Sequence, residues 1–414
     1  MATRSWQGHT VAVARVLTVT PTAANTTVYT LGTGDGLTKT VSYTSDGSAT
    51  VAEITAGLVT AWNASTAAEL AEITAADITT AFTLTGDTAG KYFSITSTGA
   101  GTLSPATTTE SQGPEDSTSA NNWGGTTPAD TDDLIVENSA VAMKYRLGQS
   151  TIELTSLTIR KSMTGDIGLE VENDDAGTTR ATQAYREYRD TYWNIDATTI
   201  TFGRGDGSGC RAKLWSTVTT TLNVHGTGST KWDTDVYPLV FKGDDASNVL
   251  NMIGDAAGNV DIAPYAGDTA VFATINKASG TLRLGTGVTL TTVNQAAGDI
   301  TIQSAATTVN QNGGTSTING AGAITSLNVN SGTCFHNGNG TITTLRLFDG
   351  VVFDVSGGNG ALTITNPVEC TGKVTIIDPK GRLGNFSYTV RGNVKDVEVD
   401  RLRPVATDVT VAIS

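Results

Sequence analysis

The second half of the chain carries a short repeat of apolar residue pairs, and no other feature of the sequence constrains the fold as strongly. Within each half of the repeat, the pairs stand about 18 residues apart, with one slip near Ile318. Glycine, asparagine, threonine and serine fill the stretches between the pairs. Two-residue alternation at a fixed short period is typical of a β-solenoid, in which every coil lays a strand on the previous coil. The pairs are Leu282/Leu284, Ile300/Ile302, Leu327/Val329 and Leu345/Leu347.

The composition agrees with a chain made of strands and turns. The 414 residues include 46 glycines, and only 16% of the residues are charged. Glycine, asparagine and threonine favour turns and strands over helices. The formal net charge of -14 argues against a nucleic-acid partner, which would require a basic face. The sequence has no apolar run long enough for a membrane helix and no signal-peptide pattern at its start, so we expect no membrane partner and synthesis in the cytoplasm.

The first hundred residues have a different pattern, which predicts a small α+β module with one amphipathic helix. Val51, Ile54, Leu58 and Trp62 recur at intervals of three or four residues, as on one face of a helix. Thr50 and Glu53, which flank the start of this segment, fit a capping box. Alternating segments before and after the helix predict strands, and the segment from residue 82 to residue 96 predicts a β-hairpin with three inward residues. These residues are Leu84, Phe93 and Ile95.

Shifts in composition divide the chain into five parts. Residues 1–100 form the predicted α+β attachment module, and residues 101–120, rich in Ser, Thr, Gly and Pro, form a linker. Residues 121–246 are a β-rich region that leads into the solenoid, and residues 247–372 form its regular coils. Residues 373–414 are more charged and predict a cap or a strand-exchange segment. The fold class predicted from these parts is mainly β, a right-handed parallel β-helix preceded by a small α+β module.

Residues with catalytic potential are scattered along the chain. The three histidines form no spaced cluster, and the sequence has no HExxH, GxSxG or Walker motif. Cys210, Cys334 and Cys370 lie far apart without CxxC spacing, which favours buried small side chains over a zinc site or a disulfide framework. We therefore predict that the protein is not an enzyme and requires no cofactor.

Two pairs of aspartates are candidate ligands for a structural calcium ion. Carboxylate oxygens near Gly and Asn can hold Ca²⁺ in a loop. Neither pair matches an EF-hand loop or a calcium-binding nonapeptide, so solvated turns are the alternative. The candidate ligands are Asp174, Asp175, Asp244 and Asp245.

Four aromatic residues lie close together in the segment from residue 185 to residue 193. Aromatic rings can stack on sugars, and they are also frequent in protein cores and subunit interfaces. Both a sugar-contact role and a packing or interface role are therefore open. The residues are Tyr185, Tyr188, Tyr192 and Trp193.

The segments "MATRSWQGHTVAVARVLTVTP", "GDTAGKYFSITST" and "ANNWGGTTPADTDDLIVENSAVAMKYRL" resemble a group of phage and prophage structural proteins. In these proteins a small N-terminal α+β module precedes an Asn-Trp motif and a β-helical stalk. The resemblance implies structural roles for Trp123, Pro128 and Asp133 at the start of the stalk, and it implies no catalytic residues. Trp123 would cover an open end of the core, and Pro128 would fix the turn before the first strand.

The resemblance implies a non-enzymatic structural component of a phage virion, either a capsid decoration protein or a fibre-like appendage. We expect the protein on the virion surface after synthesis in the host cytoplasm. The expected partners are the chain itself as a homotrimer, other virion proteins such as major capsid or tail proteins, and host-surface glycans. One alternative is a tailspike-type protein that binds or depolymerises a polysaccharide. Another alternative is a bacterial surface adhesin.

Overall fold

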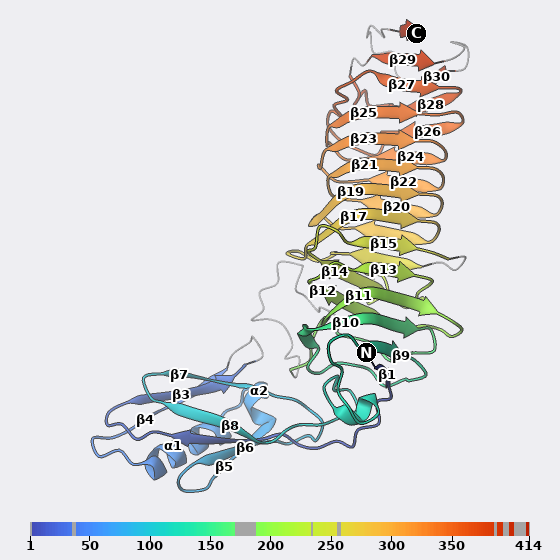
Figure 1. The fold of residues 1–414 in the computed structure, drawn as a ribbon. Helices are drawn as coiled ribbons and strands as arrows, with labels where there is room; N and C mark the ends of the chain where they lie inside the picture. The colour runs from blue at the N-terminus through green and yellow to red at the C-terminus, as the bar shows by residue number, and fades with distance from the viewer. Residues whose placement is uncertain are drawn as a thin grey trace.

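The computed structural model of the protein consists of a tall column of stacked strands and a smaller module beside the base of the column (Figure 1). The strands of the column succeed one another from the base to the C-terminal end, whereas the module is built from residues early in the chain. The described residues are 2–34, 39–169, 188–232, 235–254, 258–384, 387–391, 397–400 and 411–413.

The column contains two stacks of strands, and each strand pairs in parallel with the next strand of its own stack. From the middle of the column upward, the chain alternates between the stacks. The mainly β class and the parallel strands predicted from the sequence are thus confirmed. The first stack contains β9 (Asp133–Val136), β10 (Gly148–Arg160), β11 (Trp193–Arg204), β13 (Thr221–Val224), β15 (Val249–Met252), β17 (Ala270–Lys277), β19 (Val288–Gln295), β21 (Ala306–Gln311), β23 (Ile324–Val329), β25 (Ile342–Leu347), β27 (Val368–Thr371), β29 (Tyr388–Arg391) and β31 (Val411–Ile413). The second stack contains β12 (Ala212–Ser216), β14 (Leu239–Gly243), β16 (Asn259–Ile262), β18 (Thr281–Leu284), β20 (Asp299–Ile302), β22 (Thr315–Ile318), β24 (Thr333–His336), β26 (Val351–Asp354), β28 (Val374–Ile377) and β30 (Val397–Asp400).

The interior of the column is a continuous row of aliphatic side chains. Val293 lies under Val309, and Leu327 lies under Leu345, in successive strands of the first stack. All four side chains are at most 1% exposed. Burying each of them contributes about 1.5–3 kcal/mol to the free energy of unfolding. The alternating pairs of the sequence therefore supply the core, one turn above another.

An asparagine ladder runs along the outside of the first stack. In each step the side-chain amide donates to the side-chain oxygen of the asparagine one turn below, at 2.8–3.0 Å. The separations between successive members are 28, 25, 18, 16 and 18 residues. The predicted period of about 18 residues thus begins only in the upper column, and the slip near Ile318 is a short turn of 16 residues. The members are Asn223, Asn251, Asn276, Asn294, Asn310 and Asn328.

Beside this ladder, three longer polar side chains occupy the same inward position on successive strands. Gln295 and Gln311 each donate from Nε2 to two backbone carbonyls at 2.7–3.0 Å. Lys277, one turn lower, donates from Nζ to the carbonyl of Ala297 at 2.5 Å. Lys277 is 1% exposed, and this burial lowers the pKa of its amine to about 8, against a smaller opposing effect of Asp299.

We expect the substitution Lys277→Gln to raise the free energy of unfolding by about 1 kcal/mol at pH 7, because it removes a buried charge. The folded-state pKa of Lys277 lies below its unfolded value, so the wild-type protein becomes more stable as the pH rises from about 8 towards 10.5. The variant should lack this rise. Urea denaturation at pH 7 and pH 10 measures both effects, and a variant with an unchanged rise would contradict the assignment to Lys277.

In the described residues, the module contains two antiparallel sheets, a long helix and a short one. The four-stranded sheet has the order β5-β6-β2-β8, and the three-stranded sheet has the order β4-β3-β7. The helix α1 spans Val51–Asn63, and the predicted capping box between Thr50 and Glu53 is present. The indole of Trp62 donates to the carbonyl of Ile73 at 2.8 Å and ties the helix to the larger sheet. The remaining elements are β2 (Val16–Pro21), β3 (Val28–Thr33), β4 (Thr40–Thr44), α2 (Ala68–Ala71), β5 (Ile73–Asp77), β6 (Phe82–Gly86), β7 (Ile95–Gly99) and β8 (Leu103–Thr109).

The predicted hairpin between residues 82 and 96 is wrong. β6 pairs with β2 and β5, whereas β7 pairs with β3 in the other sheet. Leu84 and Phe93 are buried as expected, but Ile95 is only half-buried. The turn residues between the strands carry the chain from one sheet to the other instead of folding it back.

Two predicted domain boundaries also require correction. The first strand, β1 (Thr3–Trp6), pairs in parallel with β9 and belongs to the base of the column. The module is therefore an insertion between β1 and the rest of the column. The first part of the predicted linker 101–120 is a strand of the module, because β8 pairs with β2 along its whole length. The side chains of β8 are nearly all exposed, so its sequence does not alternate between apolar and polar residues.

The predicted segment 373–414 contributes β28, β29, β30 and β31, which continue the two stacks. In the described residues it therefore extends the column. Residues 401–410 and several shorter stretches lie outside the described residues.

Candidate functional site

Three tryptophans close the base of the column. Trp123 ends the short 3-10 helix η1 (Ala120–Trp123) and is 3% exposed. Its ring lies 5.2 Å from the ring of Trp6 and 6.3 Å from the ring of Trp193. The indole nitrogen donates to the carbonyl of Ser117 at 2.6 Å. Trp123 therefore packs between the other two tryptophans at the base of the column.

The other two predicted structural residues lie at the first turn. Pro128 is buried shortly before β9, and the carboxylate of Asp133 accepts from the hydroxyl of Ser156 at 2.5 Å. The neighbouring Asp132 makes more contacts, since it accepts from the amide of Ala2 at 2.9 Å and from the guanidinium of Arg4. Burial alone would raise the pKa of Asp132, but these donors lower it below its usual value. Asp132 therefore binds the start of β1 to the base of the column through these contacts.

Asn122, which the sequence analysis missed, joins both ends of the inserted module. Its side-chain oxygen accepts from the amide of Thr10 at 2.9 Å, at the point where the chain leaves β1. Its side-chain nitrogen donates to the carbonyls of Gly113 and Asp116, both at 2.8 Å, where the chain returns. Asn122 is fully buried. The Asn-Asn-Trp sequence was the available signal, although only its tryptophan was singled out.

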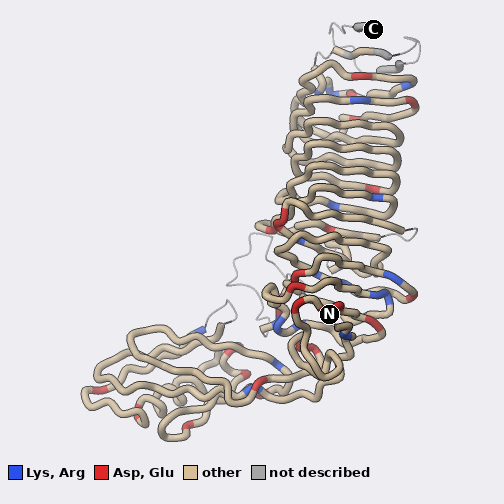
Figure 2. Tube along the Cα trace, viewed as in Figure 1, with Lys and Arg blue, Asp and Glu red and all other residues tan. Residues whose placement is uncertain are grey.

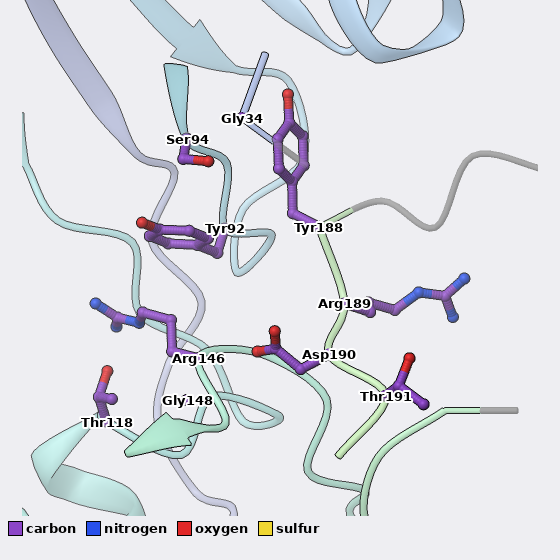
Figure 3. Close-up of a pocket in the computed structure, with 10 residues that line it drawn as sticks. All are labelled: Gly34, Tyr92, Ser94, Thr118, Arg146, Gly148, Tyr188, Arg189, Asp190 and Thr191. Atoms are coloured by element: carbon purple, nitrogen blue, oxygen red, sulfur yellow. The ribbon is translucent and has the colours of Figure 1, made fainter. Parts of the chain in front are cut away.

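A cleft of about 530 Å³ lies between the module and the column, and we call it the junction cleft (Figure 3). In Figure 3, Tyr92 and Ser94 line its module side, and Arg146 and Asp190 line its column side. The carboxylate of Asp190 accepts from the amide of Leu147 at 2.7 Å. The residues that line the cleft are Gly34, Tyr92, Ser94, Thr118, Arg146, Gly148, Tyr188, Arg189, Asp190 and Thr191.

The charged groups beside the junction cleft hold the module against the column. Arg146 donates to both carboxylate oxygens of Asp116, and to Glu110 at 3.0 Å. Two guanidinium groups lie near the ring of Tyr92, that of Arg15 at 4.3 Å and that of Arg146 at 5.5 Å from its centroid. Arg15 in turn donates to the carbonyl of Phe93 at 2.8 Å. These ion pairs and ring contacts connect the module to the column beside the cleft.

The aromatic residues proposed for sugar or interface contacts are separated by the fold. Tyr185 lies outside the described residues, whereas Tyr188 packs against Phe93 of the module, with the ring centroids 6.3 Å apart. The hydroxyl of Tyr192 donates to Asp268 at 2.5 Å. Trp193 is fully buried and donates to the side-chain oxygen of Gln149 at 2.8 Å. The described three therefore pack within the chain, and the ring of Trp193 is closed to any sugar.

Of the four aspartates predicted as calcium ligands, two lie in the described residues. Asp174 and Asp175 lie outside the described residues. Asp244 accepts from the hydroxyl of Thr269 at 2.6 Å, and Asp245 accepts from the hydroxyl of Thr219 at 2.7 Å. A backbone amide and this hydroxyl lower the pKa of Asp245. Within the described ranges, no group of three or more His, Cys, Asp or Glu side chains is arranged to hold a metal ion.

A second cluster, on the outside of the second stack, was also missed by the sequence analysis. Asp261 is fully buried and accepts from Nε and Nη2 of Arg283 at 2.6 and 2.9 Å. Burial raises the pKa of Asp261, against the opposing effect of Arg283. The ring of Tyr237 lies 5.1 Å from Nζ of Lys231 and 5.7 Å from the guanidinium carbon of Arg283. We call Lys231, Tyr237, Asp261 and Arg283 the lateral cluster.

The three cysteines are buried thiols, as the sequence analysis expected. Burial raises the pKa of Cys210 and of Cys334 to about 12, and that of Cys370 to about 11. A thiol reacts as the thiolate, so these side chains are unreactive at neutral pH. They act as small core residues.

His336 is an unusual core residue, because it is 1% exposed inside the upper column. Its ring packs against Phe353, with the centroids 6.3 Å apart, and the guanidinium of Arg382 donates to the carbonyl of His336 at 2.6 Å. Burial, together with the nearby positive charge of Arg382, lowers the pKa of His336 to about 4. The ring is therefore neutral in the folded protein at pH 7.

Acid should destabilise the upper column through His336. The unfolded chain binds a proton at this residue below about pH 6.5, whereas the folded chain binds it only near pH 4. The free energy of unfolding should therefore fall as the pH drops from 6.5 to 4, by about 3 kcal/mol. The variant His336→Leu should lose less stability over this interval in urea denaturation, whereas a variant of the exposed His9 should behave like the wild-type protein. Equal acid losses in all three proteins would contradict this prediction.

Comparison with known proteins does not assign the chain to a family. No model of a protein family, no curated protein and no solved structure matches the chain. In the part of the chain that the structure describes, no helix has the length and apolar character required to cross a membrane.

Proposed function

We propose that the chain is a non-enzymatic structural component of a phage virion, either a capsid decoration protein or a fibre-like appendage. The inserted module attaches to the particle, and the column is a right-handed parallel β-helix that projects from it or lies along its surface. The chain assembles as a homotrimer and contacts other virion proteins, such as major capsid or tail proteins.

The observation that carries this proposal is the continuous stack of the column above a tightly joined module. Backbone ladders and the asparagine ladder run along the column axis, which favours a stiff rod. Arg146 couples the module to the base of this rod through Asp116 and Glu110. A rigid rod with a separate module at one end suits attachment and projection.

The distribution of charge supports the same proposal. Figure 2 shows acidic and basic residues along the module and the lower column, whereas most of the upper column is uncharged until near its C-terminal end. In the upper part of the repeat region, Asp354 accepts from the backbone amide of Ser356 and Glu369 pairs with Arg346, so both carboxylates are engaged within the chain. The surface is suited to packing rather than to chemistry.

Localisation on the particle tests the proposal directly. Antibodies against the purified chain, carried on gold, should label the surface of intact particles of a phage that encodes it, as seen by electron microscopy. Label on the head would assign decoration, and label on the tail would assign a fibre. Particles without label, together with the protein on the bacterial surface, would reject the proposal in favour of an adhesin.

The lateral cluster favours a second candidate, a tailspike-type protein that binds or depolymerises a polysaccharide. Tyr237 is half-buried and has Lys231 and Arg283 at its ring, an arrangement that suits an acidic sugar. Incubation with acidic capsular polysaccharide, followed by an assay for new reducing ends, separates the two candidates. Turnover that is lost in a Tyr237→Ala variant would support the second candidate and reject the first.

A further inference from the structure

The outer face of β17, β19, β21, β23 and β25 carries two parallel rows of polar side chains, and we call it the amide face. One row is the upper part of the asparagine ladder on β17, β19, β21 and β23, and on β25 it ends with Arg346, which donates to the side-chain oxygen of Asn328 and pairs with Glu369. The other row contains a hydroxyl residue two positions earlier on each strand, in register from turn to turn. The hydroxyl row consists of Thr274, Thr292, Thr308, Ser326 and Thr344.

The amide face can both donate and accept hydrogen bonds along its length. A side-chain amide has two N–H donors and an oxygen with two lone pairs. Within the ladder, Asn294 and Asn310 each use one N–H and one lone pair, so the ladder bonds leave one N–H and one lone pair on each side chain. Hydroxyl groups also donate and accept. A face of this kind is complementary to the same face of other copies, as in the stacked amide rows of steric zippers, and three such faces can meet around one axis of a trimer.

Electrostatics favour this part of the molecule for contact between two identical chains. Each chain has a formal net charge of -14, so copies repel one another wherever acidic surfaces meet. From Ile300 to Leu345 the sequence contains no Asp, Glu, Lys or Arg. This uncharged belt includes β21 and β23 and most of β20, and it is visible in the upper column of Figure 2. Since charge repulsion is screened beyond about 8 Å at physiological salt, the belt is where like chains can approach.

The size of the amide face sets the expected strength of the contact. Five strands at about 4.8 Å spacing, each about 20 Å long, give roughly 500 Å² for each copy. The total of roughly 1,000 Å² corresponds to a reversible protein contact at the lower end of specific interfaces. Attachment of several copies to one particle would strengthen the contact by raising their effective concentration.

We propose that the amide face is the self-association surface of the chain, on which a second copy lies with its column side by side with the first. This inference rests on the proposed function, to which it adds the surface that joins the copies. In this arrangement the copies contact one another through their columns, and the module of each copy is free to bind the particle.

Lysine substitutions on the amide face test this inference. Thr307 and Thr325 are exposed on β21 and β23, next to the hydroxyl row and outside the asparagine ladder. The double variant Thr307→Lys/Thr325→Lys places two like charges on each copy without removing a ladder bond. Sedimentation velocity over a concentration series should show reversible association of the wild-type protein, and an at least tenfold weaker association of the variant.

A matched variant on the other stack serves as the control. Thr301→Lys/Thr317→Lys adds the same charge on the half-buried outward positions of β20 and β22. This control should associate as the wild-type protein does, and far-ultraviolet circular dichroism should be equal for all three proteins. Equal weakening by both double variants, or no weakening by the first, would overturn the assignment of the face. A monomeric wild-type protein over the whole series would overturn it as well.

A neutral polysaccharide is the other occupant that an amide and hydroxyl face could take. If the wild-type protein stays monomeric and is retarded on a dextran column, while the first double variant is not, the face binds sugar and the inference is wrong. Failure of self-association leaves the gold-labelling experiment unaffected, and unlabelled particles leave the sedimentation result unaffected. The two proposals therefore fail separately.

Discussion

Replacement of Arg382 by methionine should lower the free energy of unfolding of the upper column by about 4 kcal/mol, the largest effect that we expect from one substitution. Arg382 is 4% exposed and extends across the end of two turns. Its guanidinium donates to the carbonyls of His336, Gly338 and Val355 at 2.6–2.8 Å. Nε donates to the carbonyl of Gly360 at 2.9 Å. Methionine keeps much of the length of the side chain but leaves these buried carbonyls without donors.

Hydrogen exchange locates this loss. In a column whose turns contact mainly their neighbours, the amides of β24, β26 and β28 should exchange faster in the variant, while those of β10 and β11 should keep their wild-type rates. Lys380→Met is the control, because Lys380 makes two longer bonds, at 3.0 and 3.3 Å, at a more exposed site. A variant of Arg382 that exchanges no faster than this control would show that water replaces the lost donors.

The second large effect is expected at Asn122, where the substitution to alanine should lower the free energy of unfolding by about 3 kcal/mol. Alanine cannot replace the bonds to Thr10, Gly113 and Asp116, and it leaves their backbone groups buried without partners. The loss should loosen both connections between the module and the column. Limited proteolysis should then cut the chain near residues 8–13 and 110–118, where the wild-type protein resists.

Asn121 provides a matched control for this experiment, since it is the preceding asparagine in the same sequence motif and is exposed. Asn121→Ala should unfold with the wild-type midpoint in a thermal scan and should resist proteolysis. If both variants behave alike, the connections are held by other contacts, such as the bond from the amide of Gln7 to the backbone carbonyl of Asn122.

The column was predictable because its signal is local. Leu282 and Leu284 alternate within one strand and recur at Ile300 and Ile302, so a single pass along the sequence identifies the strands and their period. The helix α1 was predictable for the same reason, since its capping box and its buried face are both written within 13 residues. In each case the residues that decide the structure are neighbours in sequence.

Other parts of the fold depend on partners that are distant in sequence. β1 has only four residues, and its place in the column depends on β9, about 130 residues later. β8 lies at the edge of a sheet with almost all its side chains exposed, so its sequence has the polar character of a linker. A strand of this kind is defined by its backbone partner, which a periodic pattern does not reveal.

The residues of the candidate site also divide into those with a local sequence signal and those whose role depends on partners distant in sequence. Trp123 could be singled out because a tryptophan beside a glycine pair and a turn is conspicuous, and its side chain is buried. Tyr188 and Trp193 are equally conspicuous, yet Tyr188 packs against Phe93 and Trp193 is buried. Asn122 and Arg382 belong to residue types that are usually exposed, and their importance arises only from the carbonyls that the fold brings around them.

The pairing of β1 with β9 has a consequence for the order of events during synthesis. The ribosome completes β1 before β9, and β9, with which β1 pairs, emerges only after the whole inserted module has been made. The four residues of β1 therefore remain without their strand partner β9 while the module folds into its own two sheets. Only when Val136 has emerged can the lowest rung form, and the aliphatic column then extends upward from it, one turn at a time.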